Sequence, residues 1–405
     1  MTTTASVLTV KGGITAPLAF QSAALHCGIK ESELDLVLLT ANLPIPAAGL
    51  FTTNLVRGAP VILSQQHLKQ SGGYARGIVI NSGCANACTG DKGWKNAEQM
   101  AITAARALGC QPHEILLAST GVIGVDLPIE LTTAGIQTAA TALTRDESEA
   151  ASRAIMTTDP FPKEHAVTIQ TKTGTFTVGG MAKGSGMIEP MLATMLGFLT
   201  TDAQVPPTLL QQALNEVADE TFNAITVDGD CSTNDSLFAL ASGASDVVIN
   251  DSNYQALLKG LQIVSKHLAI EIVRGGEGAT KLVAITVSDA KSKYEARRVA
   301  RTVANSLLVK TAVHGADPNW GRILAAAGRS GVTFNPSLAT VSVGGVLLFE
   351  HGIPHDEASS KAGLHLQGDT IEIEVGLGLQ SGFSATVWTC DLSAEYVRIN
   401  GEYRT

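Results

Sequence analysis

Long apolar runs and clusters of positive charge are both missing from this chain of 405 residues. Its apolar stretches are short and are broken by Gly, Thr or charged residues, so none approaches the length of a membrane span. Lys and Arg number 28 against 37 Asp and Glu, which gives a net charge of -9, and no basic run is present. Phosphate binding needs clustered Lys and Arg. We therefore expect neither a nucleic acid nor a membrane as partner.

Signals for secretion and for disulfide bonding are also missing. The N-terminus lacks a basic start followed by an apolar stretch, which predicts the cytoplasm as the compartment. The sequence contains six cysteines. In a large cytoplasmic chain these are expected to be reduced thiols. Cys84 and Cys88 are four residues apart, but no further Cys or His lies close enough in sequence to complete a metal site with them.

The common nucleotide-binding and hydrolase signatures do not occur. The string GGEGATK at 275–281 is similar to a phosphate loop, but Lys281 follows Thr280, whereas the motif requires Lys directly after Gly. No G-x-G-x-x-G follows a strand, and no G-x-S-x-G elbow is present. Rossmann, kinase and elbow-hydrolase chemistries are therefore unsupported.

Two segments look like metal sites and fail the same kind of test. His351 and His355 have the spacing of a helical zinc pair, but the segment HGIPH lacks the Glu and contains Gly and Pro, which disfavour a helix. The acidic string DGDCSTND at 228–235 would need a carboxylate at its twelfth position to bind calcium, and that residue is Ala239. We expect two solvated loop histidines, and a loop that serves as scaffold around a site.

Apolar periodicity, set among 40 glycines, predicts alternating strands and helices. The residues from Trp94 to Leu108 have helical spacing with Gly109 as the C-terminal cap, and 166–171 and 175–179 read as a hairpin. A Gly-rich loop is expected over 179–186, followed by a buried strand beginning near Thr194. Further elements are expected as strands at 77–80, 114–118, 282–287, 338–349, 370–376 and 384–390, and as helices after Pro128 and Pro207 and over 254–269 and 292–310. This order favours α/β layers in which helices cover sheets.

An ordered set of strings along nearly the whole chain carries a family resemblance. The strings are TTN (52–54), NSGCANACTG (81–90), STGVIG (119–124), MTTD (156–159), AKGSGMIEPMLATMLGFLTTD (182–202), GGEGATK (275–281), DPNWGRI (317–323) and YVRINGEYRT (396–405). In this order they closely resemble the ornithine acetyltransferases, also called bifunctional glutamate N-acetyltransferases. One departure is Cys84, where the family pattern has Asn.

The resemblance implies a Thr-type N-terminal nucleophile enzyme with a layered α/β sandwich and a smaller strand-rich C-terminal domain. It also implies self-cleavage between Ala193 and Thr194. The products would be an alpha chain, 1–193, and a beta chain, 194–405, which would assemble as a heterotetramer of two each.

The chemistry of Thr194 supports this reading. A Thr hydroxyl is a poor nucleophile unless a base takes its proton. Cleavage before Thr194 would create an α-amine with a pKa of about 7.7–8.0, so that an appreciable fraction is unprotonated near neutral pH. Nucleophile and base then belong to one residue. The same hydroxyl can make the cut: it attacks the carbonyl of Ala193, the peptide rearranges to an ester, and water hydrolyses that ester. From this segment alone, a buried strand residue is the simpler interpretation.

Further site residues follow from the resemblance. Thr120 and Gly121 occupy the oxyanion positions, where a hydroxyl and a backbone N–H are suitable donors. The substrate site would contain Thr157, Lys183, Thr194, Glu277, Asn400 and Thr405. Charge complementarity assigns Lys183 to a substrate carboxylate and Glu277 to an ammonium. Without the resemblance, 119–121 is an ordinary turn, both charges are solvated, and 400–405 is a frayed tail.

The implied reaction takes an acetyl group from N-acetylornithine onto Thr194 and passes it to glutamate, within arginine biosynthesis. No metal or organic cofactor is expected, and the use of acetyl-CoA as an additional donor is left open. Two rivals remain. One is a related self-cleaving aminopeptidase, such as a β-peptidyl aminopeptidase, although those enzymes use Ser. The other is an amino-acid-binding protein without catalysis. A denaturing gel separates these readings: the two self-cleaving enzymes run as two fragments, and the binding protein runs as one chain.

Overall fold

The larger part of the molecule is built on one extensively hydrogen-bonded sheet. The computed structural model describes residues 6–189 and 195–402, so Ala193, Thr194 and Thr405 lie outside the described residues. Within them, nine strands pair in the order β1-β6-β7-β8-β9-β3-β4-β5, and β2 pairs with β3. The bounds are β1 Ser6–Val10, β2 Phe20–Leu25, β3 Leu36–Phe51, β4 Tyr74–Asn81, β5 Ile115–Ser119, β6 Lys163–Thr171, β7 Gly174–Lys183, β8 Leu196–Thr201 and β9 Ser236–Ala241.

The long strand β3 converts this sheet into a sandwich. Its first residues pair with β2 and β4, the register shifts between Thr40 and Ile45, and Ala47–Phe51 pair with β9. Apolar side chains from both halves then meet in one core, for example Ile78 of β4 and Phe198 of β8. The two halves of the sheet therefore pack face to face.

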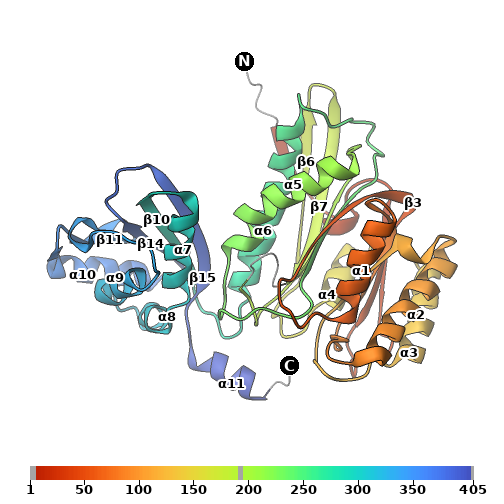
Figure 1. Cartoon of the computed structure of the whole chain (residues 1–405), viewed down its shortest axis with the longest axis horizontal. Coiled ribbons are helices and arrows are strands. Elements are labelled where there is room, and N and C mark those ends of the chain that lie inside the picture. Colours follow the sequence, from red (N-terminus) through yellow and green to blue (C-terminus); the bar gives the residue numbers. More distant parts are fainter. Residues whose placement is uncertain (1–5, 190–194, 403–405) are drawn as a thin grey trace.

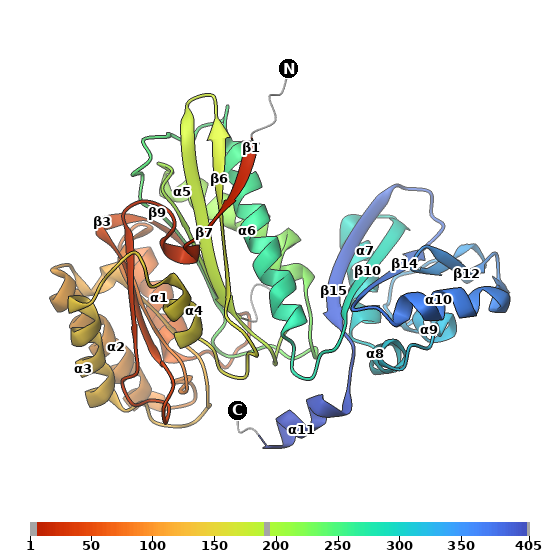
Figure 2. The same cartoon turned by 180° about the vertical axis from the view of Figure 1, so that it is seen from behind.

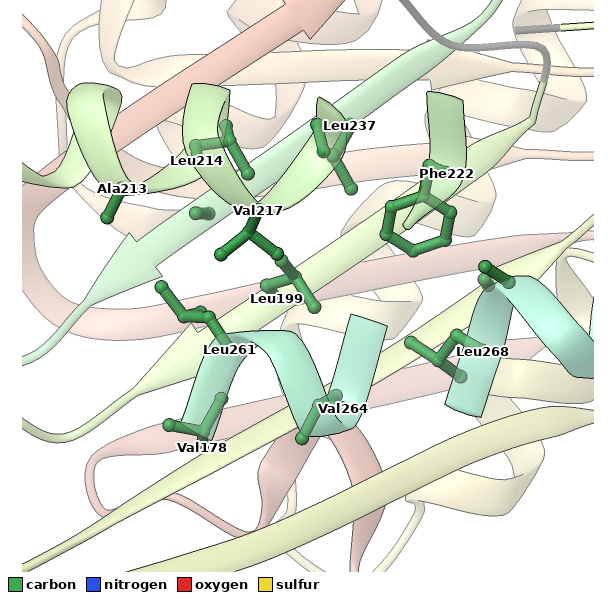
Figure 3. Close-up of a cluster of buried hydrophobic side chains, with 14 of the residues drawn as sticks. Val178, Leu199, Ala213, Leu214, Val217, Phe222, Leu237, Leu261, Val264 and Leu268 are labelled. Atoms are coloured by element: carbon green, nitrogen blue, oxygen red, sulfur yellow. The ribbon is translucent and has the colours of Figure 1, made fainter. Parts of the chain in front are cut away.

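Helices cover both outer faces of the sandwich. The helices α1 Ala59–Gln70, α2 Gly90–Leu108 and α3 Ile129–Thr141 cover β4 and β5, while α5 Pro207–Glu220 and α6 Tyr254–Arg274 cover the opposite side (Figure 1). Figure 3 shows Val217 of α5 and Leu261 of α6 close to Leu199 of β8. A short helix, α4 Ser148–Ala154, adds to the inner core. The layered α/β sandwich expected from the sequence is confirmed.

The predicted hairpin is confirmed and is longer than expected. Val167 pairs with Val178 and Ile169 with Phe176, and all four side chains are buried. The loop predicted over 179–186 is wrong in its first part, because β7 continues to Lys183. Here glycine serves close packing: a side chain on Gly179 would collide with the carbonyl oxygen of Gly13, and one on Gly180 would lie 2.9 Å from Val264.

The C-terminal part forms a second sheet with its own core. Its strands pair in the order β13-β12-β11-β14-β10-β15 (Figure 2). The bounds are β10 Leu282–Ala290, β11 Thr340–Val343, β12 Val346–Glu350, β13 Ile353–Pro354, β14 Thr370–Gly376 and β15 Phe383–Cys390, with helices α7 Lys293–Ala304, α8 Leu307–His314, α9 Trp320–Gly328 and α10 Ser359–Leu366. The smaller strand-rich domain is thus confirmed.

The single helix predicted over 292–310 is wrong, because the structure has α7 and α8 with a break at Asn305 and Ser306. The Asn305 side chain accepts a hydrogen bond from Thr226 (2.8 Å) and contacts Glu189. The break therefore lies where the C-terminal domain contacts the sandwich. After β15 the chain forms a last helix, α11 Ala394–Glu402, which extends from the C-terminal domain toward the sandwich (Figure 1).

Candidate active site

A cavity of about 220 Å³ lies where several loops of the sandwich meet α11. It is bordered by the last residues of β7, by residues just before β9 and by the loop after β5. The six described residues predicted for the site all line it: Thr120, Gly121, Thr157, Lys183, Glu277 and Asn400. Met195, the residue directly after Thr194, lines it as well. The cavity thus gathers residues that lie far apart in the sequence.

Lys183 contributes a positively charged side chain to the cavity wall. Its side-chain ammonium donates hydrogen bonds to the Thr157 hydroxyl (2.9 Å) and to the Thr120 hydroxyl (3.2 Å). The residue is only 8% exposed. Burial lowers the pKa of Lys183, and the negative charge of Asp159 opposes that effect. Lys183 is therefore a buried cation whose nearest partners are two hydroxyl groups.

Asp159 organises the residues around Lys183, although sequence reasoning assigned it no role. Its carboxylate accepts hydrogen bonds from Lys163 (2.7 Å), from the Gly184 N–H (2.7 Å) and from the Thr157 N–H (3.0 Å). Burial alone would raise its pKa, but Lys163 and Lys183 hold it well below its usual range. The sequence contained one signal for this residue: Asp159 is the acidic residue of the MTTD string, which belongs to the family resemblance.

The loop after β5 is suited to presenting an N–H and a hydroxyl. Gly121 has a φ of +125°, and a Cβ there would lie 2.6 Å from the Cys84 backbone nitrogen, so no other residue fits without displacing the chain. The Thr120 N–H donates to Asn81 (3.0 Å). The side chain of Cys84 is buried, with its thiol toward Val125. Cys84 is therefore not among the described residues that line the cavity.

Glu277 and α11 form the other side of the cavity. The Asn400 side-chain amide donates to a Glu277 carboxylate oxygen (2.7 Å). The Tyr396 hydroxyl, also on α11, donates to Asp228 (3.3 Å). Asp228 in turn accepts from the Met187 N–H (2.7 Å). The segment that could have been a frayed tail is a helix over its described part and is fixed to the cavity at two points.

The acidic loop at 228–235 borders the site, as expected from the sequence. Asp228, Asp230, Asn234 and Asp235 line the cavity. The Asn234 amide donates to the carbonyl oxygens of Ala85 (2.6 Å) and Ser119 (3.0 Å) and so ties this loop to the segment after β4 and to the end of β5. Across the described residues, no group of three or more His, Cys, Asp or Glu is arranged to hold a metal ion. No helix in that part of the chain is long and apolar enough to span a membrane.

The layered sandwich, with a hydroxyl, an ammonium and a carboxylate in one cavity, fits an acyltransferase of the N-terminal nucleophile type. Comparison with known proteins then gives the family. The sequence model of the ArgJ family matches residues 21–405, and the chain belongs to that family. The predicted enzyme class, an acetyltransferase of arginine biosynthesis, is confirmed.

The relatives match over nearly their full length. Proteins named "Arginine biosynthesis bifunctional protein ArgJ" from Symbiobacterium thermophilum and Thermosynechococcus vestitus are each 46% identical, over 97% and 98% of this chain and 99% of their own. A crystal structure of the protein of the same name from Bacillus halodurans is 40% identical with a TM-score of 0.50. That match covers 52% of this chain and 100% of the Bacillus chain.

Proposed function

We propose that this chain cleaves itself between Ala193 and Thr194. The new N-terminal Thr194 then transfers acetyl from N2-acetyl-L-ornithine to L-glutamate by a ping-pong reaction. One observation carries the proposal. The described residues assigned to the oxyanion and to the substrate line a single cavity, together with Met195, the neighbour of the nucleophile. Some of these residues are hundreds of positions apart in the sequence, and the fold brings them together.

Two findings support the cut. Strands β7 and β8 are antiparallel neighbours, with Lys183 opposite Leu196. Fragments 1–193 and 194–405 would therefore remain joined through the middle of one sheet. In addition, the Bacillus chain is matched in full by 52% of this chain, which is the share of the sequence that follows Ala193. The length of the Bacillus chain therefore agrees with that of the proposed beta chain.

The proposed steps need no group beyond these residues and the substrates. The α-amine of Thr194 takes the hydroxyl proton, and the hydroxyl oxygen attacks the acetyl carbonyl of N-acetylornithine. The Thr120 hydroxyl and the Gly121 N–H donate to the oxyanion. The C–N bond breaks, the α-nitrogen of ornithine takes the proton, and ornithine leaves. The glutamate amine then attacks the acetyl-Thr194 ester and the ester C–O bond breaks. The Thr194 oxygen takes the proton lost by the amine, which gives N-acetylglutamate and the free hydroxyl.

Recognition of the substrate follows from charge. Lys183 has one N–H that is not used on the two threonines, and this can bind the α-carboxylate that both substrates share. Glu277 is 7% exposed and lines the cavity, where it can bind the side-chain ammonium of ornithine. Thr157, Asn400 and Thr405 complete the substrate site. We further propose a cytoplasmic heterotetramer of two alpha and two beta chains.

Isotope exchange tests the ping-pong order. Protein incubated with N-acetylornithine and labelled free ornithine, without glutamate, is expected to form labelled N-acetylornithine, because the acetyl-enzyme can return its acetyl group. Exchange that appears only when glutamate is present contradicts the proposal. A binding protein without catalysis gives no exchange under either condition. A parallel reaction with acetyl-CoA and glutamate shows whether acetyl-CoA is a second donor.

A further inference from the structure

We propose that Lys183 is a positioning residue for the oxyanion donor, which it holds through the hydroxyl of Thr120, in addition to any contact with a substrate carboxylate. By donating to Thr120 and Thr157, the ammonium forces each of these hydroxyls to direct its own proton elsewhere, and at Thr120 that direction is toward the acetyl oxygen. This role rests on the proposed acetyl transfer and specifies how its transition state is stabilised.

The proposal depends on which hydrogen bonds an ammonium and a hydroxyl can donate and accept. An ammonium has three donors and no acceptor, whereas a hydroxyl has one donor and can accept. At 2.9 Å and 3.2 Å from Lys183, the oxygens of Thr157 and Thr120 must therefore accept. The hydroxyl proton of Thr120 remains available for another acceptor. A hydrogen bond received by a hydroxyl also strengthens the one that it donates.

The partners of Lys183 differ from those of most buried lysines. Buried lysines are normally paired with a carboxylate. Among the described residues, Lys183 has no carboxylate within 4.0 Å, whereas its neighbour Lys163 is paired with Asp159 at 2.7 Å. Lys183 thus lies next to the oxyanion donors without a direct ion-pair partner. Its partners are the two hydroxyls, so its charge acts on the oxyanion through the hydrogen bond to Thr120.

The surrounding backbone fixes this geometry. Lys183 is the last residue of β7 and is paired with Leu196 in the sheet. Asp159 binds the N–H of Gly184, directly after Lys183, and the N–H of Thr157. One buried carboxylate therefore holds both the lysine and one of its two hydroxyl partners in place.

A substrate without the α-carboxylate separates this role from carboxylate binding. N-acetylputrescine is N-acetylornithine without that group. Acetylation of the fragment that begins at Thr194 is followed by mass spectrometry and counted per cleaved chain. The comparison includes Lys183→Met, Thr120→Val and the double variant. Lys172→Met, which removes an exposed lysine from the β6–β7 turn, serves as a control expected to react at the normal rate.

Lys183→Met is expected to acetylate about tenfold or more slowly with N-acetylputrescine, since a charged hydrogen bond is lost. The double variant is expected to react no more slowly than Thr120→Val, because Lys183 acts through Thr120. Normal acetylation in Lys183→Met would leave only carboxylate binding and overturn the proposal. The proposal is also overturned if the double variant is slower than Thr120→Val by the same factor that Lys183→Met alone loses.

Self-cleavage provides the same test without any substrate, for the case that variants remain uncut or that N-acetylputrescine is a poor donor. The rate of cutting is measured after synthesis in vitro for the same three variants. Slower cutting in Lys183→Met, with no further loss in the double variant, supports the proposal; cutting at the normal rate in Lys183→Met contradicts it. If the unaltered chain neither cuts nor becomes acetylated, the proposed function itself fails, and that outcome is distinct.

Discussion

Thr194→Ala is expected to remain a single chain of 42.0 kDa and to lose acetyl transfer completely. The proposed cut uses the Thr194 hydroxyl to attack the preceding carbonyl, and the proposed transfer uses the same oxygen to carry the acetyl group. Alanine removes this oxygen and leaves a smaller side chain that cannot act as a nucleophile. A denaturing gel of the purified variant shows the chain, and an assay for ornithine release shows the activity.

Thr194→Ser is the matched control for that experiment, because it keeps a hydroxyl and the capacity to generate an N-terminal amine. It is expected to give two fragments. Should Thr194→Ala also give two fragments divided at the same bond, another group makes the cut and the assignment of the nucleophile is wrong.

Thr120→Val is expected to lower kcat on the order of 100-fold with little change in KM. The hydroxyl donates to an oxygen that becomes strongly negative only in the tetrahedral intermediate, so its loss affects the transition state more than the bound substrate. Valine keeps the branched shape and removes only the hydroxyl. Rates must be expressed per chain cleaved at Thr194, because self-cleavage passes through a similar intermediate and is expected to slow as well.

A purely structural role for Thr120 makes a different prediction. If the side chain only shapes the turn after β5, the variant loses stability but turns over at a near-normal rate per cleaved chain. Thr120→Ser, which retains the hydroxyl, is then expected to behave like Thr120→Val, whereas the oxyanion role predicts a much higher kcat for the serine variant.

Local patterns in the sequence predicted the elements that depend on local interactions. The helix ending before Gly109 is α2, and Gly109 adopts the left-handed conformation of a C-terminal cap. The buried strand expected near Thr194 is β8, which begins at Leu196. Apolar spacing reports which face of an element is buried, so periodic segments of this kind are well predicted.

Features that depend on distant parts of the chain were not predicted. Gly179 looked like a loop residue, because its need for glycine comes from Gly13, far away in sequence. The break between α7 and α8 coincides with contacts of Asn305 to Thr226 and Glu189. Periodicity contains no information about either contact.

The same distinction holds for the site. The family resemblance supplied the identities of Thr120, Lys183 and Glu277, and the structure brings them to one cavity. Neither charge nor spacing could indicate that Lys183 donates to two hydroxyls, or that Asp159 holds the backbone beside it. Such roles depend on distances between side chains from separate strands and loops.

The most direct test of the account is the mass of the fragment that begins at Thr194 after brief exposure to N-acetylornithine without glutamate. This fragment is expected to gain one acetyl group, fragmentation is expected to place the group on the Thr194 side chain, and addition of glutamate is expected to remove it. An unmodified fragment, under conditions in which the same protein releases ornithine, would contradict the covalent mechanism.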